Sequence, residues 1–420
     1  MTLRTPSSGH ALARHATATA SWSMPAASAR RRFDARGDLA RGVRRLVRMA
    51  ASTAMALVLS FVLSLAVAPS AHGQGCRSDV NGDGMVDAAD LAIVLGDWGV
   101  ACPPAITAVS PSSGEPTGGT VITLTGEGLL TTTSVTIGGA ACTNLVVLSS
   151  TEVRATTPPG KLGARTIVLT TADGRTTEAP TPFIYYVTPS WATPVEAVPD
   201  PAIVYDAELR AAIIATGWAW KVLDNGTGIE MVLIPPGTYD MGCSASNLWG
   251  CDNNENPVHP VTITQPFYMS RTEVTQAQWT VVMGSNPSYF QSASAETPGW
   301  NRPVEVVSWN TIQGFLSATG MRLPTEAEWE YAYRAGTTTA YHGWAGQPGW
   351  TNDDSLAGTI AWYSSNASSQ TRPVGGKAAN GFGLHDMAGN VHEWVSDWYL
   401  SNYYASSPLE DPQGPTSGSN

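Results

Sequence analysis

The sequence predicts a multidomain chain with a small calcium-loop/helix unit, an all-β sandwich, and an α/β domain of low regular secondary structure. Three observations predict this order. A loop rich in Asp and Gly lies near residue 80, short runs of Thr and Val between Gly and Pro turns follow it, and 12 of the 15 Trp residues lie from position 218 onward. A chain of 420 residues has room for about two to four domains.

Changes in composition set the expected domain boundaries. Pro and Ala dominate the stretch before position 218, which we expect to be a linker with one helix at Tyr205–Ala215. The expected parts are a basic extension with a signal peptide at residues 1–73, the calcium unit at 76–102, the sandwich at 105–187, the linker at 188–217 and the α/β domain at 218–420.

The net charge of −11 hides an asymmetry between the N-terminal extension and the rest of the chain. Residues 1–48 contain ten Arg and two Asp. Removing these from the chain totals of 23 basic and 34 acidic residues leaves 13 and 32, a net charge of −19 from position 49 onward. Because so acidic a body repels phosphate backbones, we expect no nucleic-acid partner.

Residues 49–68 carry no charge and follow a cluster of four Arg, and small residues come next. Ala66–Ala68 and Ala71–Gly73 are candidate cleavage sites, so the pattern predicts a secretory signal peptide. The alternative is an uncleaved membrane anchor, because about 20 apolar residues can just span a bilayer. Cleavage would leave no stable membrane span. Either way we expect an exported protein that is extracellular, periplasmic or associated with the cell envelope.

Five cysteines in an exported chain predict disulfides. Cys76 and Cys102 bracket the calcium unit, and Cys243 and Cys251 lie eight residues apart in a loop rich in Gly and Asn. We expect each pair to form a local disulfide and Cys142 to remain a buried, unreactive thiol.

The segment Asp79–Asp90 fits the template of a calcium loop, with oxygen ligands at positions 1, 3, 5, 7, 9 and 12 and a glycine, Gly84, at the sharp turn. It resembles dockerin repeats, in which the loop leads directly into a helix, here expected at Ala88–Trp98. The alternative is an acidic turn without metal. The expected ligands are Asp79, Asn81, Asp83, the carbonyl of Met85, Asp87 and Asp90.

Alternating residues between Gly and Pro turns predict the β-sandwich. Its segments Ile106–Gly114 and Gly118–Gly126 resemble those of IPT/TIG immunoglobulin-like domains. No cluster of side chains suited to catalysis is visible, so we expect a spacer or binding module. The clearest expected strands are Val121–Thr125, Ser134–Ile137, Asn144–Leu148 and Thr166–Thr170.

The stretch Arg322–Ala332 (RLPTEAEWEYA) predicts a helix in the α/β domain whose start is encoded locally. Thr325 and Glu328 have the spacing of a capping box, and Gly336 provides a stop. Other periodic stretches are short. The expected helices are Thr275–Met283, Trp309–Thr319 and Thr325–Arg334, and the expected strands are Met231–Ile234, Thr238–Met241 and Val261–Ile263.

Two strings in this domain carry a family resemblance. Arg322–Tyr331 (RLPTEAEWEY) and Gly383–Trp394 (GLHDMAGNVHEW) closely resemble signature segments of the formylglycine-generating enzyme family, also called sulfatase-modifying factors. The resemblance implies a compact α/β fold similar to that of C-type lectins. Three further matches precede these strings in the family's order: Met231–Gly242, Glu273–Trp279 and Pro303–Trp309.

The resemblance implies a second calcium site, formed by the carboxylates of Asp386 and Glu393 and the carbonyls of Gly389 and Val391. Such oxygen sets suit a hard cation, whereas hydrogen-bonded loop carboxylates are the alternative. His385 and His392 occupy positions where the family has Tyr and Trp. They could hold a transition metal or pack as substitutes for these aromatic rings.

The resemblance also specifies what oxidase chemistry requires. Formylglycine-generating enzymes oxidise a substrate cysteine with O2 and a copper ion held by two cysteines in the family's last segment. The sequence reaches Asn420 where that segment would begin, and neither Cys243 nor Cys251 matches its position. We therefore expect a C-terminally truncated domain without catalytic or cofactor-binding residues, with copper relevant only if that segment exists.

Two functions follow from these observations. The first is a binding or assembly protein of the cell envelope that uses the family fold without oxidation, with a protein or glycan partner. The alternative is a full-length copper-dependent oxidase that acts on a cysteine of sulfatase-like proteins. No nucleophile elbow, phosphate-binding glycine loop or zinc-type Cys spacing suggests a further enzyme class.

Overall fold

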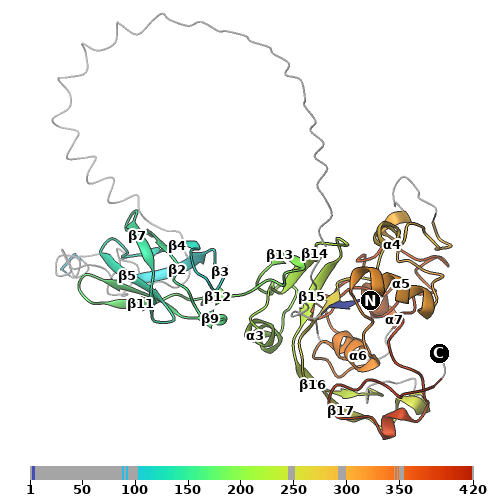
Figure 1. The fold of residues 1–420 in the computed structure, drawn as a ribbon. Helices are drawn as coiled ribbons and strands as arrows, with labels where there is room; N and C mark the ends of the chain where they lie inside the picture. Colours follow the sequence, from blue (N-terminus) through green and yellow to red (C-terminus); the bar gives the residue numbers. More distant parts are fainter. Residues whose placement is uncertain are drawn as a thin grey trace, which may run out of the picture. The chain divides into compact units, whose positions relative to one another are not determined.

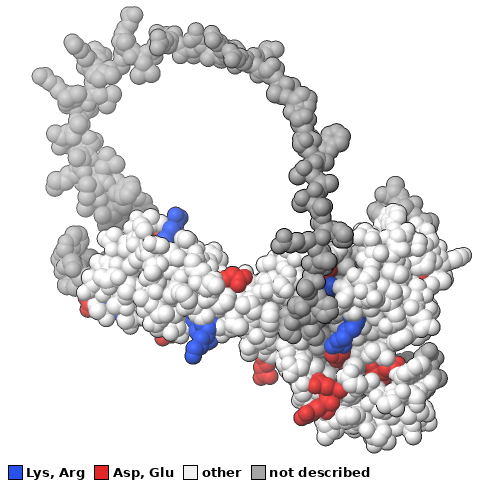
Figure 2. All heavy atoms as spheres, viewed as in Figure 1, with Lys and Arg blue, Asp and Glu red and all other residues white. Residues whose placement is uncertain are grey.

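The computed structural model describes residues 2–4, 88, 91–92, 103–244, 251–291, 299–344, 346–347, 349 and 354–418 (Figure 1). The ligands predicted in the loop Asp79–Asp90, the apolar segment 49–68, and Cys76 and Cys102 lie outside the described residues. Within the described parts of the chain, no helix combines the length and hydrophobicity that a membrane span requires. Charged side chains are sparse on the face shown in Figure 2.

The first described region is a β-sandwich built from three small sheets. Two four-stranded sheets have the orders β2-β4-β8-β7 and β11-β10-β5-β6, and a third has the order β3-β12-β9. The strands are β2 (Ala105–Ser110), β3 (Ser113–Gly114), β4 (Val121–Glu127), β5 (Thr132–Ile137), β6 (Ala140–Ala141), β7 (Thr143–Val147), β8 (Glu152–Thr156), β9 (Gly163–Arg165), β10 (Ile167–Thr171), β11 (Thr176–Glu178) and β12 (Phe183–Tyr185).

The alternation of residues along each strand explains the core of the sandwich. Ile122 and Leu124 of β4 are fully buried, and their neighbour Val121 is exposed. Ile167 and Leu169 of β10 are also fully buried and belong to the same hydrophobic cluster. Because side chains of a strand point alternately to opposite faces, this pattern places one face of each sheet in the core.

The second region contains a five-stranded antiparallel sheet with the order β1-β18-β15-β14-β13. A separate antiparallel pair, β16 and β17, lies in the same region. The strands are β1 (Leu3–Arg4), β13 (Ala192–Glu196), β14 (Lys221–Asp224), β15 (Glu230–Ile234), β16 (Gly237–Met241), β17 (His259–Ile263) and β18 (Phe267–Ser270).

Five α-helices and three short 3-10 turns complete the described part of this domain. Helices α4 and α6 both begin with a full capping box, in which the N-cap Thr and the Gln or Glu three residues later exchange hydrogen bonds. The helices are α3 (Ala207–Ala215), α4 (Gln276–Met283), α5 (Trp309–Thr319), α6 (Glu326–Arg334) and α7 (Asp354–Ile360); the turns are η1 (Asn253–Glu255), η2 (Gly299–Asn301) and η3 (Tyr403–Ala405).

The N-terminal residues form part of this sheet, which the sequence did not predict. Leu3 is fully buried and pairs with Met269 of β18, and its backbone exchanges hydrogen bonds with Arg322 at 2.8 and 3.1 Å. Arg4 lies 3.2 Å from the buried carboxylate of Asp224. Cleavage of the predicted signal peptide would remove this strand from the exported chain.

The expected linker also differs from the structure. Within residues 188–217, β13 pairs with β14 in the main sheet, and α3 follows with Asp206 as its N-cap. This stretch therefore contributes structure to the domain, because its Pro residues are confined to an edge strand and turns.

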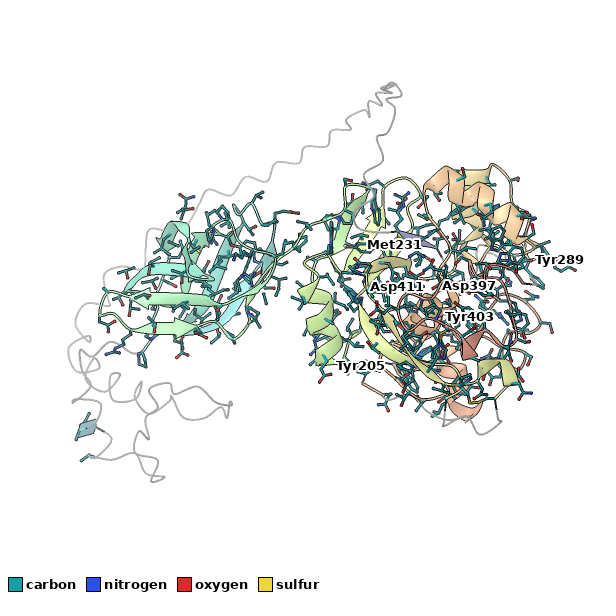
Figure 3. All side chains as sticks on the ribbon, turned by 60° about the horizontal axis from the view of Figure 1, so that its bottom comes forward. Tyr205, Met231, Tyr289, Asp397, Tyr403 and Asp411 are labelled. Carbon is teal, nitrogen blue, oxygen red and sulfur yellow. A yellow bond between two sulfur atoms is a disulfide. The ribbon has the colours of Figure 1, made fainter. Side chains whose placement is uncertain are left out.

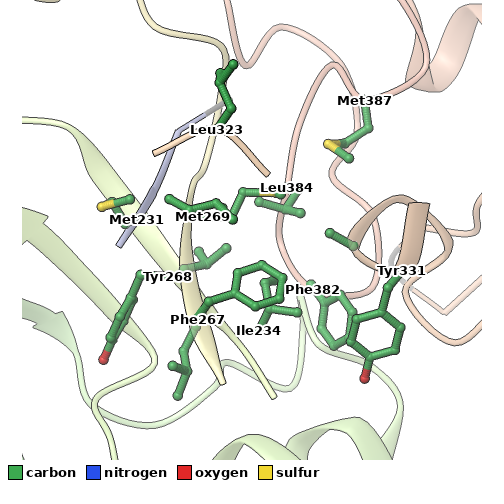
Figure 4. Packing of buried hydrophobic residues seen from close by; sticks show 14 of the residues in the cluster. Met231, Ile234, Phe267, Tyr268, Met269, Leu323, Tyr331, Phe382, Leu384 and Met387 are labelled. Atoms are coloured by element: carbon green, nitrogen blue, oxygen red, sulfur yellow. The ribbon is translucent and has the colours of Figure 1, made fainter. Parts of the chain in front are cut away.

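The core of the domain lies between the sheet and the segments around α6. Tyr331 of α6 and Phe382 have ring centroids 5.7 Å apart, and Figure 4 shows Phe382 with Tyr331 on one side and Ile234 and Phe267 on the other. These residues belong to one hydrophobic cluster that includes Leu384 and Met387. The cluster therefore anchors the first half of the Gly383–Trp394 string.

Candidate functional site

The two signature strings meet at one surface cavity of about 570 Å³, here called the signature pocket. Helix α6 contributes Glu326 and Trp329, and the rest of the wall comes from Trp362 and the segment 387–399. Among the lining residues, the acids are Glu326, Glu393 and Asp397, and the aromatic residues are Trp329, Trp362, Trp398 and Tyr399. Figure 3 labels Asp397 within the domain and shows Tyr289 at the domain's edge.

The first turn of α6 is held in place from several directions. Arg322 binds Glu328 with two hydrogen bonds of 2.6 Å each, next to the capping box. The backbone N–H of Glu326 donates to Asp397 Oδ1 at 3.0 Å, and the Tyr404 hydroxyl donates to Glu326 Oε1 at 3.0 Å. Burial raises the pKa of the Glu326 carboxyl above its ordinary value.

The Gly383–Trp394 string folds as a loop with unusual backbone angles. Asp386 and Asn390 have φ values of 60° and 68°, a region that Asp and Asn tolerate better than most residues. Asn390 exchanges hydrogen bonds with the backbone of Arg372 at 2.8 and 3.1 Å. A Cβ on Gly389 would lie 2.3 Å from the carbonyl oxygen of Trp362, so this position requires glycine.

A hydrogen bond joins the two strings directly. Trp329 Nε1 of α6 donates to Glu393 Oε2 at 3.1 Å. The ring of Trp329 stacks on Tyr333 one turn later, with centroids 5.5 Å apart. Together these contacts fix the orientation of one carboxylate at the edge of the signature pocket.

Three acidic side chains, Glu273, Asp386 and Glu393, form what we call the carboxylate cluster. Glu273 is 4% exposed and Asp386 is 2% exposed. Burial, followed by repulsion from Asp386 and Glu393, raises the pKa of Glu273 well above its ordinary value. Burial also raises the pKa of Asp386. The structure thus brings the two predicted carboxylates, Asp386 and Glu393, near a third carboxylate, that of Glu273.

Unpaired oxygens identify this cluster as a candidate cation site. Three buried oxygens have no hydrogen-bond partner among the described residues: both carboxylate oxygens of Glu273 and Oδ1 of Asp386. Burying a charged oxygen without a partner costs several kcal/mol, so such groups bind a proton or a cation. With the carbonyls of Gly389 and Val391, the donor set consists of the hard oxygens that calcium prefers.

A second group of possible metal ligands cannot bind a metal through its sulfurs, because they form a disulfide. Among the described residues, Cys243, Cys251 and Glu255 each place one possible metal-ligand atom within 4.8 Å of the other two. The two sulfurs form the predicted disulfide, so they offer no thiolate. The carboxylate cluster is wider than this group, and a bound ion would have to draw its oxygens inward.

The histidines and the remaining cysteine have separate roles. Both ring nitrogens of His385 have partners, at 3.0 Å from Arg271 Nη2 and at 2.8 Å from the Lys377 carbonyl oxygen, which leaves none for a metal. His392 lines the signature pocket. Burial lowers the pKa of His342 to about 4. Cys142 is a free thiol, and burial raises its pKa to about 11.

Sequence reasoning missed Glu273 as a site residue, although the Glu273–Trp279 string contributed to the resemblance. It lies 113 positions before Asp386, and no local spacing connects the two. Its position in the sequence could have indicated a site residue. Glu273 lies three residues after the fully buried strand β18 and two residues before Thr275, the N-cap of α4. Acidic residues are rarely buried, so an acidic residue between two buried elements is a candidate for a specific interaction.

Comparisons with known proteins agree with both resemblances. Residues 222–418 match the model of the sulfatase-modifying factor enzyme 1-like domain, and residues 104–185 match that of the IPT/TIG domain. The formylglycine-generating enzyme of Streptomyces coelicolor is 30% identical over 240 residues, which cover 44% of this chain and 74% of that protein.

Two other relatives carry different names. The chaperone protein LppX of Paenibacillus barcinonensis is 32% identical over 226 residues, covering 40% of this chain and 72% of that protein. The serine/threonine-protein kinase pkn1 of Chlamydia caviae is 34% identical over 210 residues, covering 45% of this chain and 31% of that protein. This chain belongs to the sulfatase-modifying factor family and carries an IPT/TIG domain ahead of its family domain.

Proposed function

We propose that this protein is an exported binding protein whose sulfatase-modifying factor domain holds a segment of a partner protein in the signature pocket without oxidising it. The observation that carries the proposal is the lining of the pocket, which combines aromatic rings with carboxylates. Trp398 and Tyr399 are 43% and 52% exposed, so they offer apolar area and hydrogen-bonding groups to a partner.

The cysteines of the domain support binding over oxidation. Cys243 and Cys251 form a disulfide, and neither lines the signature pocket among the described residues. Copper held by the family mechanism requires thiolates, which a disulfide does not supply. The names of relatives support a protein partner rather than a glycan, because a chaperone and a protein kinase are both named for proteins they act on or with.

The alternative function is that of a copper-dependent formylglycine-generating oxidase. The 30% identity to the Streptomyces coelicolor enzyme over 240 residues favours it. In that case the substrate would be a cysteine of a sulfatase-like protein, and the signature pocket would hold the residues around that cysteine.

The proposal includes calcium at two places. One ion would bind the loop Asp79–Asp90 through its predicted ligands. The other would bind Asp386 and Glu393 with the carbonyls of Gly389 and Val391. Because Gly389, Val391 and Glu393 also line the signature pocket, this second ion would fix the shape of the pocket wall.

A peptide that carries a sulfatase-type cysteine motif separates the two functions. We would titrate the labelled peptide with the full chain, follow its fluorescence anisotropy, and then measure the peptide's mass after incubation with copper and oxygen. We expect saturable binding and an unchanged mass. The variant Trp398→Ala should weaken binding at least about tenfold, because it removes an exposed aromatic contact.

The matched control is Trp300→Ala, since Trp300 is 53% exposed but does not line the signature pocket. A mass loss that matches conversion of the thiol to an aldehyde, above a metal-free control, would establish the oxidase instead. Absence of saturable binding, or equal weakening by both variants, would overturn the binding proposal.

A further inference from the structure

A separate cavity of about 240 Å³ is lined by two indoles, those of Trp220 and Trp344, and by three basic side chains, Lys221, Arg271 and His385. We call it the indole cavity. The rest of its described lining consists of Ala, Ile and Gly, and none of its lining residues also lines the signature pocket. Its volume corresponds to about eight water molecules at roughly 30 Å³ each, so it has room for a small organic molecule.

The main sheet places two of the basic side chains on one face. Lys221 of β14 pairs with Val232 of β15, which in turn pairs with Met269 of β18. Arg271 comes two residues after Met269, and its N–H continues the pairing by donating to the carbonyl of Glu230 at 2.9 Å. Because paired residues share a face and side chains alternate along a strand, Lys221 and Arg271 point to the same side of the sheet.

The acidic partners of these two cations lie outside the lining of the cavity. Lys221 Nζ donates to Glu196 Oε1 at 2.5 Å, and Arg271 Nη1 donates to Glu230 Oε1 at 3.0 Å. The side chains of Glu196 and Glu230 are 38% and 32% exposed, whereas Lys221 is buried. Because ion pairs that reach solvent are weak, these acids leave both cations able to attract a further anion.

The side chains that line the cavity offer donors and no free acceptor among the described residues. An ammonium group carries three N–H donors and a guanidinium five, and the described bonds use one of Lys221 and two of Arg271. Trp220 is fully buried, and its Nε1 has no described hydrogen-bond partner. His385 donates from Nδ1 to the carbonyl of Lys377, so its acceptor Nε2 is occupied by Arg271. A ligand of this cavity therefore needs acceptor atoms.

We propose that the indole cavity binds a small organic carboxylate that carries a flat apolar group. Lys221, Arg271 and the indole N–H of Trp220 bind the carboxylate, because charged and neutral donors converge there. The apolar group packs against the indoles, as in other small-ligand sites that combine an apolar lining with few polar groups. A bare sulfate or phosphate fits less well, since the apolar lining would leave several of its oxygens unpaired.

The position of the Lys221 ammonium fits this arrangement. Its Nζ lies 4.7 Å from the centre of the Trp220 ring, so a carboxylate on the ammonium has an indole beside it. The chain contains three Lys residues, and Lys221 is a buried one in a strongly acidic domain. Buried lysines are uncommon unless they are paired, which makes a role in binding an anion more specific than a role in solubility. The site does not depend on the proposed function of the signature pocket.

Calorimetric titration of the full chain with phenylacetate tests the proposal. We expect saturable binding at one site. Phenylacetamide has the same shape without the charge, and it should bind at least about tenfold more weakly, as should sulfate. The absence of saturable binding at millimolar phenylacetate, or equal affinity for the acid and the amide, would overturn the proposal.

Two variants locate the site. Lys221→Met and Arg271→Met should each weaken phenylacetate binding at least about tenfold, because each removes a charged donor. The matched control is Lys161→Met, since Lys161 is exposed in the β-sandwich and its loss should leave the affinity unchanged. Equal affinities in Lys221→Met and the control would show that phenylacetate binds elsewhere. Thermal unfolding of each variant establishes that the domain is folded.

Glu196→Gln provides a test that does not require the loss of a buried cation. It removes the acidic competitor for Lys221, so phenylacetate should bind at least about threefold more tightly. Glu178→Gln, at an exposed position of the sandwich, is the matched control and should not change the affinity. If the pair of Lys221 and Glu196 only stabilises the fold, Glu196→Gln lowers the melting temperature without tightening binding, and the proposal fails.

A free acid and the C-terminus of a peptide share this chemistry, and competition separates them. A tetrapeptide of three alanines and a C-terminal phenylalanine would be compared with its C-terminal amide as a competitor of phenylacetate. Displacement by the free carboxylate form alone would show that a chain end fits the cavity, and displacement by neither would restrict the ligand to free acids. Equal displacement by both forms would contradict recognition of a carboxylate.

Discussion

The β-sandwich and the sulfatase-modifying factor domain bury different kinds of residues. In the sandwich, the buried polar side chains among the described residues are Thr132, Thr157 and Thr171. Thr132 shows the pattern, since its hydroxyl donates to the carbonyl of Leu129 at 2.6 Å. The family domain buries ionisable and amide groups as well, among them Lys221, Asp224, Glu273, Gln276, Arg302, Arg334, His342, Asn380 and Asp386.

This difference separates scaffold from function. Alternating apolar residues make up the core of the sandwich, and its buried polar side chains are all Thr. The family domain holds its loops with side-chain hydrogen bonds and retains buried oxygens without a hydrogen-bond partner at Glu273 and Asp386. Buried polar groups that are costly and incompletely paired mark candidate functional sites.

The largest effect is expected at Asn380, which is fully buried. Its side chain donates to the carbonyls of Ala332 and Tyr333 at the end of α6 and accepts from the N–H groups of Phe382 and Leu384. Asn380→Ala leaves several of these groups unpaired and should lower the free energy of unfolding by about 4 kcal/mol. Chemical denaturation followed by Trp fluorescence measures it.

The control for Asn380 is Asn402→Ala, because Asn402 is exposed and its side chain makes no capping hydrogen bond. If both variants lose the same stability, the domain does not depend on buried amide contacts, and the contrast with the sandwich fails.

The second effect concerns pH. Burial lowers the pKa of His342 to about 4 from 6.5, so the unfolded chain binds more protons than the folded chain between these values. Stability from this residue is therefore complete above pH 6.5 and decreases by about 3 kcal/mol as the pH falls toward 4. His342→Gln should flatten the stability profile across this window by that amount.

The difference between wild type and variant isolates His342 from other titrating groups such as His385, whose pKa burial also lowers. The sandwich at residues 103–187 contains no His, so its transition should not change in the same window. Parallel profiles for wild type and His342→Gln would contradict the assignment of His342 as a buried neutral ring.

The third effect tests the cap of α6. Thr325 is 3% exposed, and its hydroxyl accepts from the N–H of Glu328 at 3.1 Å. Thr325→Ala should lower the free energy of unfolding by about 1.5 kcal/mol. Thr325→Ser retains the hydroxyl acceptor, so its free energy of unfolding should stay close to that of the wild type. If both variants lose the same stability, the effect comes from packing of the Thr325 methyl group and not from the cap.

The smallest effect is expected in the sandwich. Ile122→Val removes one methyl group from a fully buried site and should cost about 1 kcal/mol. Circular dichroism measures it, because residues 103–187 contain no Trp. Val121→Ala, at an exposed position of the same strand, should have almost no effect, and a larger loss there would show that alternation does not determine the core.

Local signals in the sequence were enough to predict much of the fold. The helix expected at Thr325–Arg334 begins at Glu326 with Thr325 as its N-cap, and Trp309–Thr319 has the expected bounds. The expected strand Val121–Thr125 extends to Glu127 in the structure. Capping boxes and alternation act within a few residues, so a single sequence contains them completely.

Long-range contacts could not be predicted in the same way. Leu3 reaches the core through pairing with Met269, 266 positions away, and nothing near Leu3 indicates this partner. Glu273 lies close to Asp386 only in the folded domain, because 113 positions separate them in the sequence. The resemblance predicts Asp386 and Glu393 as site residues, whereas no local pattern in the sequence connects Glu273 with them.

One measurement tests the central claim that the signature strings build a cation site behind the signature pocket. Crystals of the full chain grown with terbium would be measured for anomalous scattering. We predict a peak about 2.3–2.6 Å from carboxylate oxygens of Asp386 and Glu393. The account would be contradicted by a map without a peak at this cluster and with a hydrogen bond between the carboxyl groups of Glu273 and Asp386.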